Sequence, residues 1–547
     1  MFPILSGILQ GCPLSGTLFV FVIDPLLWMF RCHLNKAIIR ACADDVGAAL
    51  RRLSYLATLH KLFSEFRSVS LLTLKPTKCV IIMTVCDLSD GNLELIRQWL
   101  AVHIPDWKHM KIQGSAKYLG MHLGPEAGAV QWDKPIEKFN GRVSEINSTS
   151  GPISFAIRQF NCKAVPVLGY KAQMVSPPTK IIRTELSAIL TALKLAGNSM
   201  TADCAYDLQD WLGLDPIRPS LYMVASMLRA AFKTLVDYAP MHNELRSLAV
   251  DCFVLAKAFT TIIPPGWDSN AFCSNLFEAS QLHSKFISVG ARAPLRRVLL
   301  EWRDGKGGKS LQKGFYNCLR TQFVDGWCGL ISDKINDVVI GDGGSFVFDP
   351  QHKHGFLTVL KKVPASNKTS FFKTIINSWA TSHRYHEHVL LPCIFGCEGE
   401  KDDLQHYLRC DPMWTCAVTA SSLPRDFLAL SPMQRLCIVS HDVNGLRLLG
   451  VVYRGYHALR LGHRYLIDKC VASGDFTEIL LLFTHLCGDA WRHITGETHI
   501  SRQRPTPVAK AKTKVRARAK AHSHTQSTRN NARPAADAPD VYSWWIA

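Results

Sequence analysis

Two adjacent carboxylates, Asp44 and Asp45, lie between the apolar runs Ala37–Ile39 and Val46–Leu50. Like charges this close resist joint ionisation, and Mg²⁺ removes that cost because it binds carboxylates together with substrate phosphates. The flanking runs predict a β-hairpin with both acids at its tip. Such a pair could hold the ions of two-metal phosphoryl transfer, whereas the dipeptide by itself also fits a solvated turn.

A second set of candidate ligands has the spacing Cys-x3-Cys-x8-His-x3-Cys, formed by Cys393, Cys397, His406 and Cys410. Zn²⁺ takes four nitrogen or sulfur ligands in a tetrahedron, and short paired spacings let two turns close on one ion. Gly396 suits a knuckle turn, and the stretch Asp402–His406 can start a helix that presents His406 and Cys410 on one face. The alternative is a set of buried thiols in a helical domain, since the chain has 18 Cys.

Three further motifs flank the acidic pair. Gln10-Gly11-Cys12-Pro13-Leu14-Ser15 precedes it, while Lys78 at the mouth of an apolar strand and then Tyr118-Leu119-Gly120 follow it. In this order and spacing the series resembles the second half of the palm of reverse transcriptases from non-LTR retrotransposons. The close resemblance covers about the first quarter of the chain, and the remainder matches only loosely.

The resemblance implies an RNA-directed DNA polymerase with an RNA template and a DNA primer or target as partners. It assigns Mg²⁺ binding and catalysis to Asp44 and Asp45, with a primer 3′-hydroxyl attacking the α-phosphate of a dNTP. The other roles that it implies are template and nucleotide contacts at Gln10, Gly11, Pro13, Ser15 and Lys78, and a primer grip at Tyr118, Leu119 and Gly120. A Cys-Cys-His-Cys knuckle follows the polymerase in many such elements. The spacing between its His and its last Cys is often four residues there, whereas three residues separate His406 from Cys410 here.

Two departures from the family pattern bear on activity. Cys42 stands where the family usually has Tyr or Phe, next to the ligand positions but outside them. The third carboxylate of the family belongs to a strand before Gln10, and Asp24 lies inside a predicted helix and cannot replace it. Because losing one ligand disturbs both ions, we expect a truncated polymerase fragment that is inactive alone. The alternative is a non-catalytic nucleic-acid-binding protein that uses the knuckle and a basic tail.

The elements that must position these residues predict an α+β fold, a partial antiparallel palm followed by a mostly helical remainder. Periodicity predicts a helix over residues 13–31 with Leu18, Val22, Leu26 and Met29 on its apolar face. The apolar run 79–83 predicts a buried strand. The other predicted elements are helices at 55–66, 91–103, 132–143, 179–196, 221–238, 255–262, 281–299, 446–461 and 477–491, and short strands at 118–123 and 346–348.

Six regions follow from these expectations. They are a partial palm at 1–130, a helical thumb-like region at 131–240, a connector of unknown role at 241–385, a zinc knuckle at 386–415, a helical C-terminal region at 416–500 and a disordered basic tail at 501–547. In the thumb-like region, several cations could together form an electrostatic track for backbone phosphates, namely Lys134, Lys138, Arg142, Lys180 and Arg183. Each of them alone fits an ordinary surface charge.

The chain is basic, with a net charge of +19 and a pI of about 9.2, which favours an acidic polymer as partner. From Ser501 onward, ten Lys and Arg stand against two Asp, a net charge of +8 that leaves +11 for the remainder. Such tails bind nucleic acid or act as nuclear localisation signals, and a functionless extension is the alternative. The cations singled out in this tail are Lys510, Lys512, Lys514, Arg516, Arg518 and Lys520.

Cysteine usage and the opening residues bear on the compartment. The 18 Cys follow no small regular framework, and no basic stretch precedes the first apolar run. These features predict reduced thiols in the cytoplasm or nucleus. We expect no membrane partner, because Asp24-Pro25 interrupts the apolar run Leu18–Phe30, which is shorter than the ~20 residues a bilayer needs.

Overall fold

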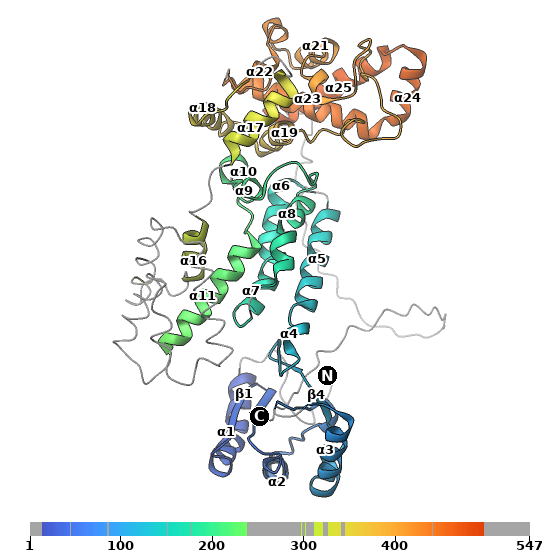
Figure 1. Cartoon of the computed structure of the whole chain (residues 1–547). Coiled ribbons are helices and arrows are strands. Elements are labelled where there is room, and N and C mark those ends of the chain that lie inside the picture. The colour runs from blue at the N-terminus through green and yellow to red at the C-terminus, as the bar shows by residue number, and fades with distance from the viewer. Residues whose placement is uncertain are drawn as a thin grey trace, which may run out of the picture. The chain divides into compact units, whose positions relative to one another are not determined.

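The computed structural model describes residues 14–43, 45–84, 87–149, 151–175, 177–237, 311–320, 326–340, 345–439 and 441–496, together with 297 and 301. Over these ranges the fold is mostly helical with three two-stranded sheets, which confirms the α+β class. The described residues form two compact units, 14–134 and 135–496 (Figure 1). The strands all belong to the first unit.

The first unit alternates short strands with helices. Its elements are α1 Ser15–His33, β1 Ile38–Cys42, β2 Asp45–Ala49, α2 Tyr55–Ser70, a 3₁₀ turn Pro76–Lys78, β3 Val80–Ile82, α3 Asp90–His103, a 3₁₀ turn Pro105–Trp107, β4 Lys111–Gln113, β5 Ala116–Tyr118, β6 Met121–Leu123 and α4 Ala127–Val130. Strands β1 and β2 pair antiparallel, β3 and β4 parallel, and β5 and β6 antiparallel.

The second unit is helical. Its elements are α5 Asp133–Ser148, α6 Ile153–Gln159, a π-helical turn Phe160–Ala164, α7 Pro166–Ala172, α8 Thr179–Ala192, α9 Ala202–Ala205, α10 Gln209–Leu212, α11 Pro219–Asp237, α16 Leu311–Arg320, α17 Trp327–Ile335, a π-helical turn Asn336–Ile340, α18 Pro350–Leu360, α19 Ala365–Ile375, α20 Leu404–Tyr407, α21 Asp411–Ala420, a 3₁₀ turn Arg425–Leu428, α22 Pro432–Arg435, α23 Val443–Gly462, α24 Arg464–Ser473 and α25 Thr477–Thr495.

The predicted hairpin around the acidic pair is confirmed. Cys42 on β1 lies opposite Asp45 on β2, where the turn closes. Ala43 in that turn has a φ of 53°, the left-handed conformation that two-residue hairpin turns use. Val46 and Ala48 on β2 are buried, and they anchor the hairpin in the core of the first unit.

Helix α1 confirms the helix predicted over residues 13–31 but differs from it at part of the apolar face. It runs through Pro25 without ending. Leu26 and Phe30 are buried in the core, and this packing offsets the hydrogen bond that a Pro removes. Leu18 and Val22 of the predicted apolar face are 44% and 45% exposed. The predicted apolar face is wrong at these two positions, because α2, which packs on α1, leaves Leu18 and Val22 uncovered.

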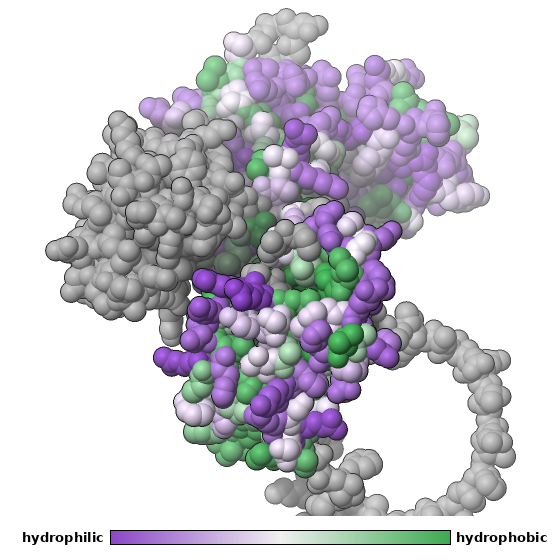
Figure 2. Space-filling view, turned by 60° about the horizontal axis from the view of Figure 1, so that its bottom comes forward, coloured by the Kyte–Doolittle hydropathy of each residue, from purple (hydrophilic) through white to green (hydrophobic). Residues whose placement is uncertain are grey.

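Helix α1 is also the one helix of the described residues with the length and apolar composition to cross a membrane, over Gly16–His33. Core helices and N-terminal signal sequences share that composition. Phe21 and Trp28 on this helix are 71% and 66% exposed, and Figure 2 shows hydrophobic residues among hydrophilic ones on the surface of the first unit. The expected absence of a membrane partner stays a prediction.

The other elements predicted for the first unit are confirmed with one change. Helix α2 buries the predicted stripe at Leu56, Leu59 and Leu62, and all three residues of β3 are buried. The single strand expected at 118–123 is instead a second hairpin, β5–β6, because Leu119 and Gly120 have φ values of 45° and 82°. Two successive left-handed residues reverse the chain, which a single strand cannot do.

Aromatic side chains hold distant helices of the second unit together. Trp211 of α10 lies with its ring centroid 4.9 Å from that of Trp327 on α17 and 6.3 Å from that of Phe371 on α19. Such rings bury large apolar areas and add specific ring–ring contacts. They therefore join residues that lie more than one hundred positions apart.

Helix α23 is the central helix of the C-terminal part and packs against α19, α21 and α25. Gly455 permits the close approach of α25, since a Cβ there would come within 2.8 Å of the Phe483 ring. The helices predicted near 446–461 and 477–491 are confirmed as α23 and α25, and those near 132–143, 179–196 and 221–238 as α5, α8 and α11.

The strand predicted at 346–348 is wrong. The backbone N–H groups of Phe346 and Phe348 donate to the side chains of Asn336 and Ser332, so these donors pair with side chains rather than with a strand partner. The helices predicted at 255–262 and 281–299 lie outside the described residues, except for residue 297, which is helical.

Candidate metal centre

The first two ligands, Cys393 and Cys397, lie on a short loop of the second unit. An antiparallel bridge between Pro392 and Lys401 closes this loop, and Cys393 N donates to Glu400 O at 2.8 Å. The loop therefore returns on itself within a few residues. That geometry brings the second thiol back toward the first.

Gly396 makes the turn between these two thiols. Its φ is +87°, and a Cβ there would come within 2.6 Å of the Phe476 ring. The neighbouring Phe395 N donates to Cys393 Sγ at 3.4 Å, a contact that favours the thiolate form. The knuckle turn predicted at Gly396 is confirmed.

The other two ligands, His406 and Cys410, lie on two successive helices. Asp403 caps the first of them, α20, by accepting from His406 N at 2.8 Å, so the predicted helix start is confirmed. Cys410 is not on that helix but at the N-cap of α21. Pro412 at the start of α21 suits a new helix and could not continue an old one. The prediction that one helix face carries both His406 and Cys410 is therefore wrong.

The structure nevertheless brings all four predicted ligands together. The ligand atoms of Cys393, Cys397, His406 and Cys410 lie within 4.8 Å of one another. Cys410 Sγ lies 3.8 Å from Cys393 Sγ and 3.7 Å from Cys397 Sγ. Three of the four residues are buried, and Cys397 is half-buried. This group could hold a metal ion.

The thiols strongly perturb each other. A hydrogen bond from Cys410, helped by the interaction with the nearby His406, lowers the pKa of Cys393 despite burial. That same bond and burial raise the pKa of Cys410 well above its usual range. Burial and the charge of Cys393 raise the pKa of Cys397 to about 11. One thiolate thus forms readily, and a bound cation would be needed to hold the other two ionised.

His406 is oriented by Glu400. Its Nδ1 lies 3.1 Å from Glu400 Oε2, while its Nε2 is buried and has no hydrogen bond of ordinary geometry to any described residue. Burial lowers the pKa of His406, but Cys393 and Glu400 outweigh that effect and raise it overall. Nε2 is therefore available to bind a metal, while the Glu400 carboxylate lies beside Nδ1. Metal-bound His commonly has a carboxylate in this position. Nothing in the spacing pointed to Glu400.

The acidic hairpin is described only in part. Asp44 lies outside the described residues, and Asp45 is half-buried at the start of β2. The Tyr118 hydroxyl donates to Arg40 O on β1 at 3.3 Å, and burial and then the charge of Asp45 raise the pKa of Tyr118. Asp45 and Tyr118 are thus brought together. Within the described residues, Asp45 belongs to no group of three or more metal-ligand side chains.

The remaining predicted site residues that the structure describes lie in turns or at the ends of elements of the first unit. Lys78 is exposed at the end of the 3₁₀ turn before β3, Leu119 and Gly120 form the β5–β6 turn, and Ser15 is the first residue of α1. Outside the described residues lie Gln10, Gly11, Pro13, Lys510, Lys512, Lys514, Arg516, Arg518 and Lys520.

No protein-family model matches the chain, and no curated protein matches its sequence. The resemblance to reverse transcriptases therefore rests on the sequence motifs alone.

Proposed function

We propose that this chain binds Zn²⁺ through Cys393, Cys397, His406 and Cys410, and that the unit organised by this ion binds nucleic acid. The observation that carries the proposal is the convergence of the four ligand atoms within 4.8 Å. Three thiols and one imidazole are a donor set typical of structural zinc sites, which leave no open position for substrate. The proposed role of the ion is therefore to hold the fold.

The distances between the thiols support zinc in particular. With Zn–S bonds of about 2.3 Å, the edge that joins two sulfurs of a tetrahedron is about 3.8 Å. The two Sγ–Sγ distances at Cys410 are 3.8 Å and 3.7 Å. Hard ions such as Mg²⁺ take oxygen ligands, and the soft donor set here does not suit them.

The charge of the protein supports nucleic acid as the partner. The chain carries a net charge of +19, of which +11 remains without the segment after residue 500. Lys and Arg that neutralise phosphates release counterions, and such binding weakens steeply as salt rises. Both RNA and DNA offer this chemistry, and the proposal does not depend on base recognition.

Fluorescence anisotropy of the full chain with labelled single-stranded RNA and DNA tests the proposal. We expect the affinity to fall with salt and to fall again when the zinc is removed by Cys410→Ser. The matched control is Cys416→Ser, which removes a half-buried thiol of the same helix outside the metal group. Binding that is insensitive to salt, or equal in the two variants, would contradict the proposal.

A second candidate function, set against the inactivity that the sequence leads us to expect, is RNA-directed DNA synthesis by the first unit. It is favoured by Asp45 at the closing end of the β1–β2 hairpin, with Tyr118 of the β5–β6 hairpin beside it. Mg²⁺-dependent primer extension on an RNA template tests this candidate. Incorporation that Asp45→Ala abolishes would support it, whereas no incorporation, or incorporation that persists in Asp45→Ala, would speak against polymerase activity of this chain.

A further inference from the structure

Asp402 is a carboxylate with no exposed surface, placed between the two pairs of metal ligands. It is not itself a member of the ligand group. A buried carboxylate is costly unless several hydrogen bonds replace its water. We therefore expect Asp402 to accept several strong hydrogen bonds from its neighbours.

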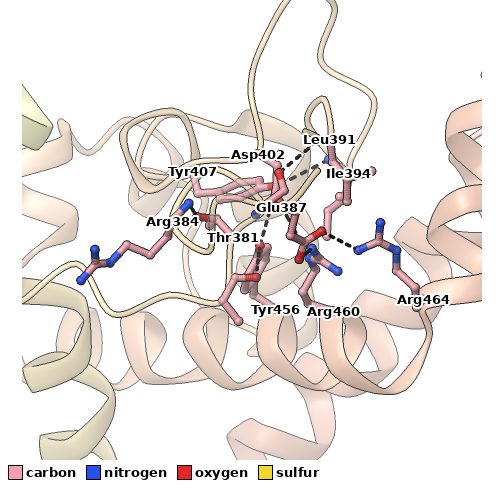
Figure 3. Close-up of polar contacts among 12 residues, drawn as sticks. Thr381, Arg384, Glu387, Leu391, Ile394, Asp402, Tyr407, Tyr456, Arg460 and Arg464 are labelled. Atoms are coloured by element: carbon pink, nitrogen blue, oxygen red, sulfur yellow. Dashed lines mark hydrogen bonds and ion pairs between the residues drawn. The ribbon is translucent and has the colours of Figure 1, made fainter. Parts of the chain in front are cut away.

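Three donors meet at this carboxylate, and we call Asp402, Ser382, Tyr407 and Tyr456 the Asp402 hub. Oδ1 accepts from the hydroxyls of Tyr407 at 2.6 Å and Tyr456 at 2.8 Å. Oδ2 accepts from Ser382 N at 2.6 Å. Figure 3 shows the side chains of Tyr407 and Tyr456 converging on Asp402, with Tyr456 reaching it from helix α23 beneath. Hydrogen bonds to an ionised carboxylate are stronger than hydrogen bonds between neutral groups.

A second layer of charge surrounds the Asp402 hub. Arg460 Nε lies 3.8 Å from Asp402 Oδ2, and its Nη2 pairs with Glu387. Glu387 is in turn paired with Arg464 at 2.9 Å. These alternating charges offset the buried negative charge of Asp402. The carboxylate is therefore held in place on both of its sides.

The Asp402 hub reaches the chain on either side of the metal ligands. The hydroxyl oxygen of Tyr407, the residue after His406, accepts from Ile394 N, the residue after Cys393, at 3.4 Å. Asp402 N donates to Leu391 O at 3.1 Å, and Leu391 N donates to Ser382 Oγ at 3.0 Å. The segment before Cys393 and the helix of His406 thus depend on one carboxylate.

We propose that Asp402 is a positioning residue of the metal centre, which it joins to helix α23 through the Tyr456 hydroxyl. It holds the Cys393 side and the His406 side of the site in register, so that four ligands meet one ion without a large rearrangement. This inference rests on the zinc site proposed above, although not on nucleic-acid binding. Residues behind the ligands commonly contribute to metal affinity in this way.

Metal affinity of the full chain tests the proposal, with Zn²⁺ competition against a chromophoric chelator and Co²⁺ absorption as readouts. We expect Asp402→Asn to weaken Zn²⁺ binding about 10-fold and to alter the Co²⁺ ligand-field bands. Tyr456→Phe, which removes one hydroxyl and keeps the ring, should weaken binding several-fold. Tyr453→Phe is the matched control, because it removes a buried hydroxyl from the same helix that is not bonded to Asp402.

Thermal unfolding with and without Zn²⁺ separates positioning from general stability. Positioning predicts that the rise in Tm caused by zinc shrinks in Asp402→Asn and Tyr456→Phe but not in Tyr453→Phe. Equal losses of Tm in the metal-free and zinc-loaded forms, with wild-type affinity, would overturn the proposal and leave the zinc site intact. If Asp402→Asn does not fold, Tyr456→Phe decides. A wild-type chain without tetrahedral Co²⁺ bands would overturn the zinc site and this proposal together.

Discussion

Two buried charges of the second unit, Asp402 and Arg435, have specific partners. Asp402 meets two tyrosine hydroxyls, and Arg435 donates to Leu408 O and Leu428 O while its guanidinium lies 4.9 Å from the Trp414 ring. An unpaired buried charge would cost several kcal/mol, so each of these contacts is needed. Leu408 lies between His406 and Cys410, and Arg435 thereby holds the chain between two metal ligands.

His457 makes the stability of the second unit depend on pH. Burial lowers its pKa to about 4, with Ala380 N donating to its Nε2 and its Nδ1 bonded to Tyr453 O. The unfolded chain, with a pKa near 6.5, binds more protons between these values. Stability is therefore full above about pH 6.5 and is lost as the pH falls toward 4, by roughly 3 kcal/mol at most.

Urea unfolding of wild type and His457→Gln at a series of pH values between 7.5 and about 4 checks this expectation. Gln can keep the bond from Ala380 N but does not titrate. The variant should lose less stability than wild type across the window, and the difference between the two removes the separate acid sensitivity of the metal ligands. Parallel pH profiles would show that His457 does not carry the effect.

At the scale of elements, short turns decide how the candidate ligands meet. The Cys393–Cys397 loop needs a left-handed residue at Gly396, and the β1–β2 and β5–β6 hairpins need left-handed Ala43, Leu119 and Gly120. Residues with a Cβ are strained in this conformation, and glycine is not. The knuckle adds a steric demand, because the Phe476 ring covers Gly396.

Variants at two glycines of the loop that the Pro392–Lys401 bridge closes distinguish backbone strain from steric crowding. Gly396→Ala places a Cβ at 2.6 Å from the Phe476 ring, whereas Gly399→Ala, at a φ of +71°, meets no atom within 4 Å. We expect Gly399→Ala to cost about 1 kcal/mol of stability from strain alone. Gly396→Ala should cost about 1–3 kcal/mol more from overpacking and should weaken Zn²⁺ binding. Chemical denaturation and metal competition measure both effects, and equal losses would show that Phe476 does not constrain the turn.

At the scale of the whole molecule, the metal centre and the charge of the chain act on different properties. The metal centre lies within the second unit, where α21, α23 and α25 pack against one another, so zinc is expected to stabilise that unit. The net charge of +19 acts at longer range on association with polyanions. Replacing one metal ligand should therefore mainly affect the stability of the second unit. Removing several Lys and Arg should mainly affect nucleic-acid binding.

Deleting residues 501–547 removes ten Lys and Arg and two Asp. We expect the logarithm of nucleic-acid affinity to depend less steeply on the logarithm of salt concentration, by several units if most of these cations contact phosphates. The zinc-induced rise in Tm should be unchanged, because all four ligands remain. Anisotropy titrations across a range of salt concentrations measure the slope, and an unaltered slope would show that the tail makes no phosphate contacts.

Features that depend on near neighbours along the chain follow from the sequence. The β1–β2 hairpin follows from apolar runs on both sides of a short polar turn, and α2, α23 and α25 follow from helical periodicity. The four metal ligands could be chosen because their spacing is short, so few chain conformations keep them apart. The nucleic-acid partner and the polymerase resemblance stay predictions, since no described contact tests them.

Contacts between distant residues depend instead on how the segments pack together. Leu18 and Val22 are apolar at helical spacing, yet they are exposed, and no element of the described residues covers them. Phe346–Phe348 reads as a strand, yet the side chains of Asn336 and Ser332 take its backbone donors. Asp402 and Tyr456 lie fifty-four positions apart, and no local pattern marks either. Periodicity and spacing report the conformation of a segment, whereas burial and hydrogen-bond partners depend on which other segments pack against it.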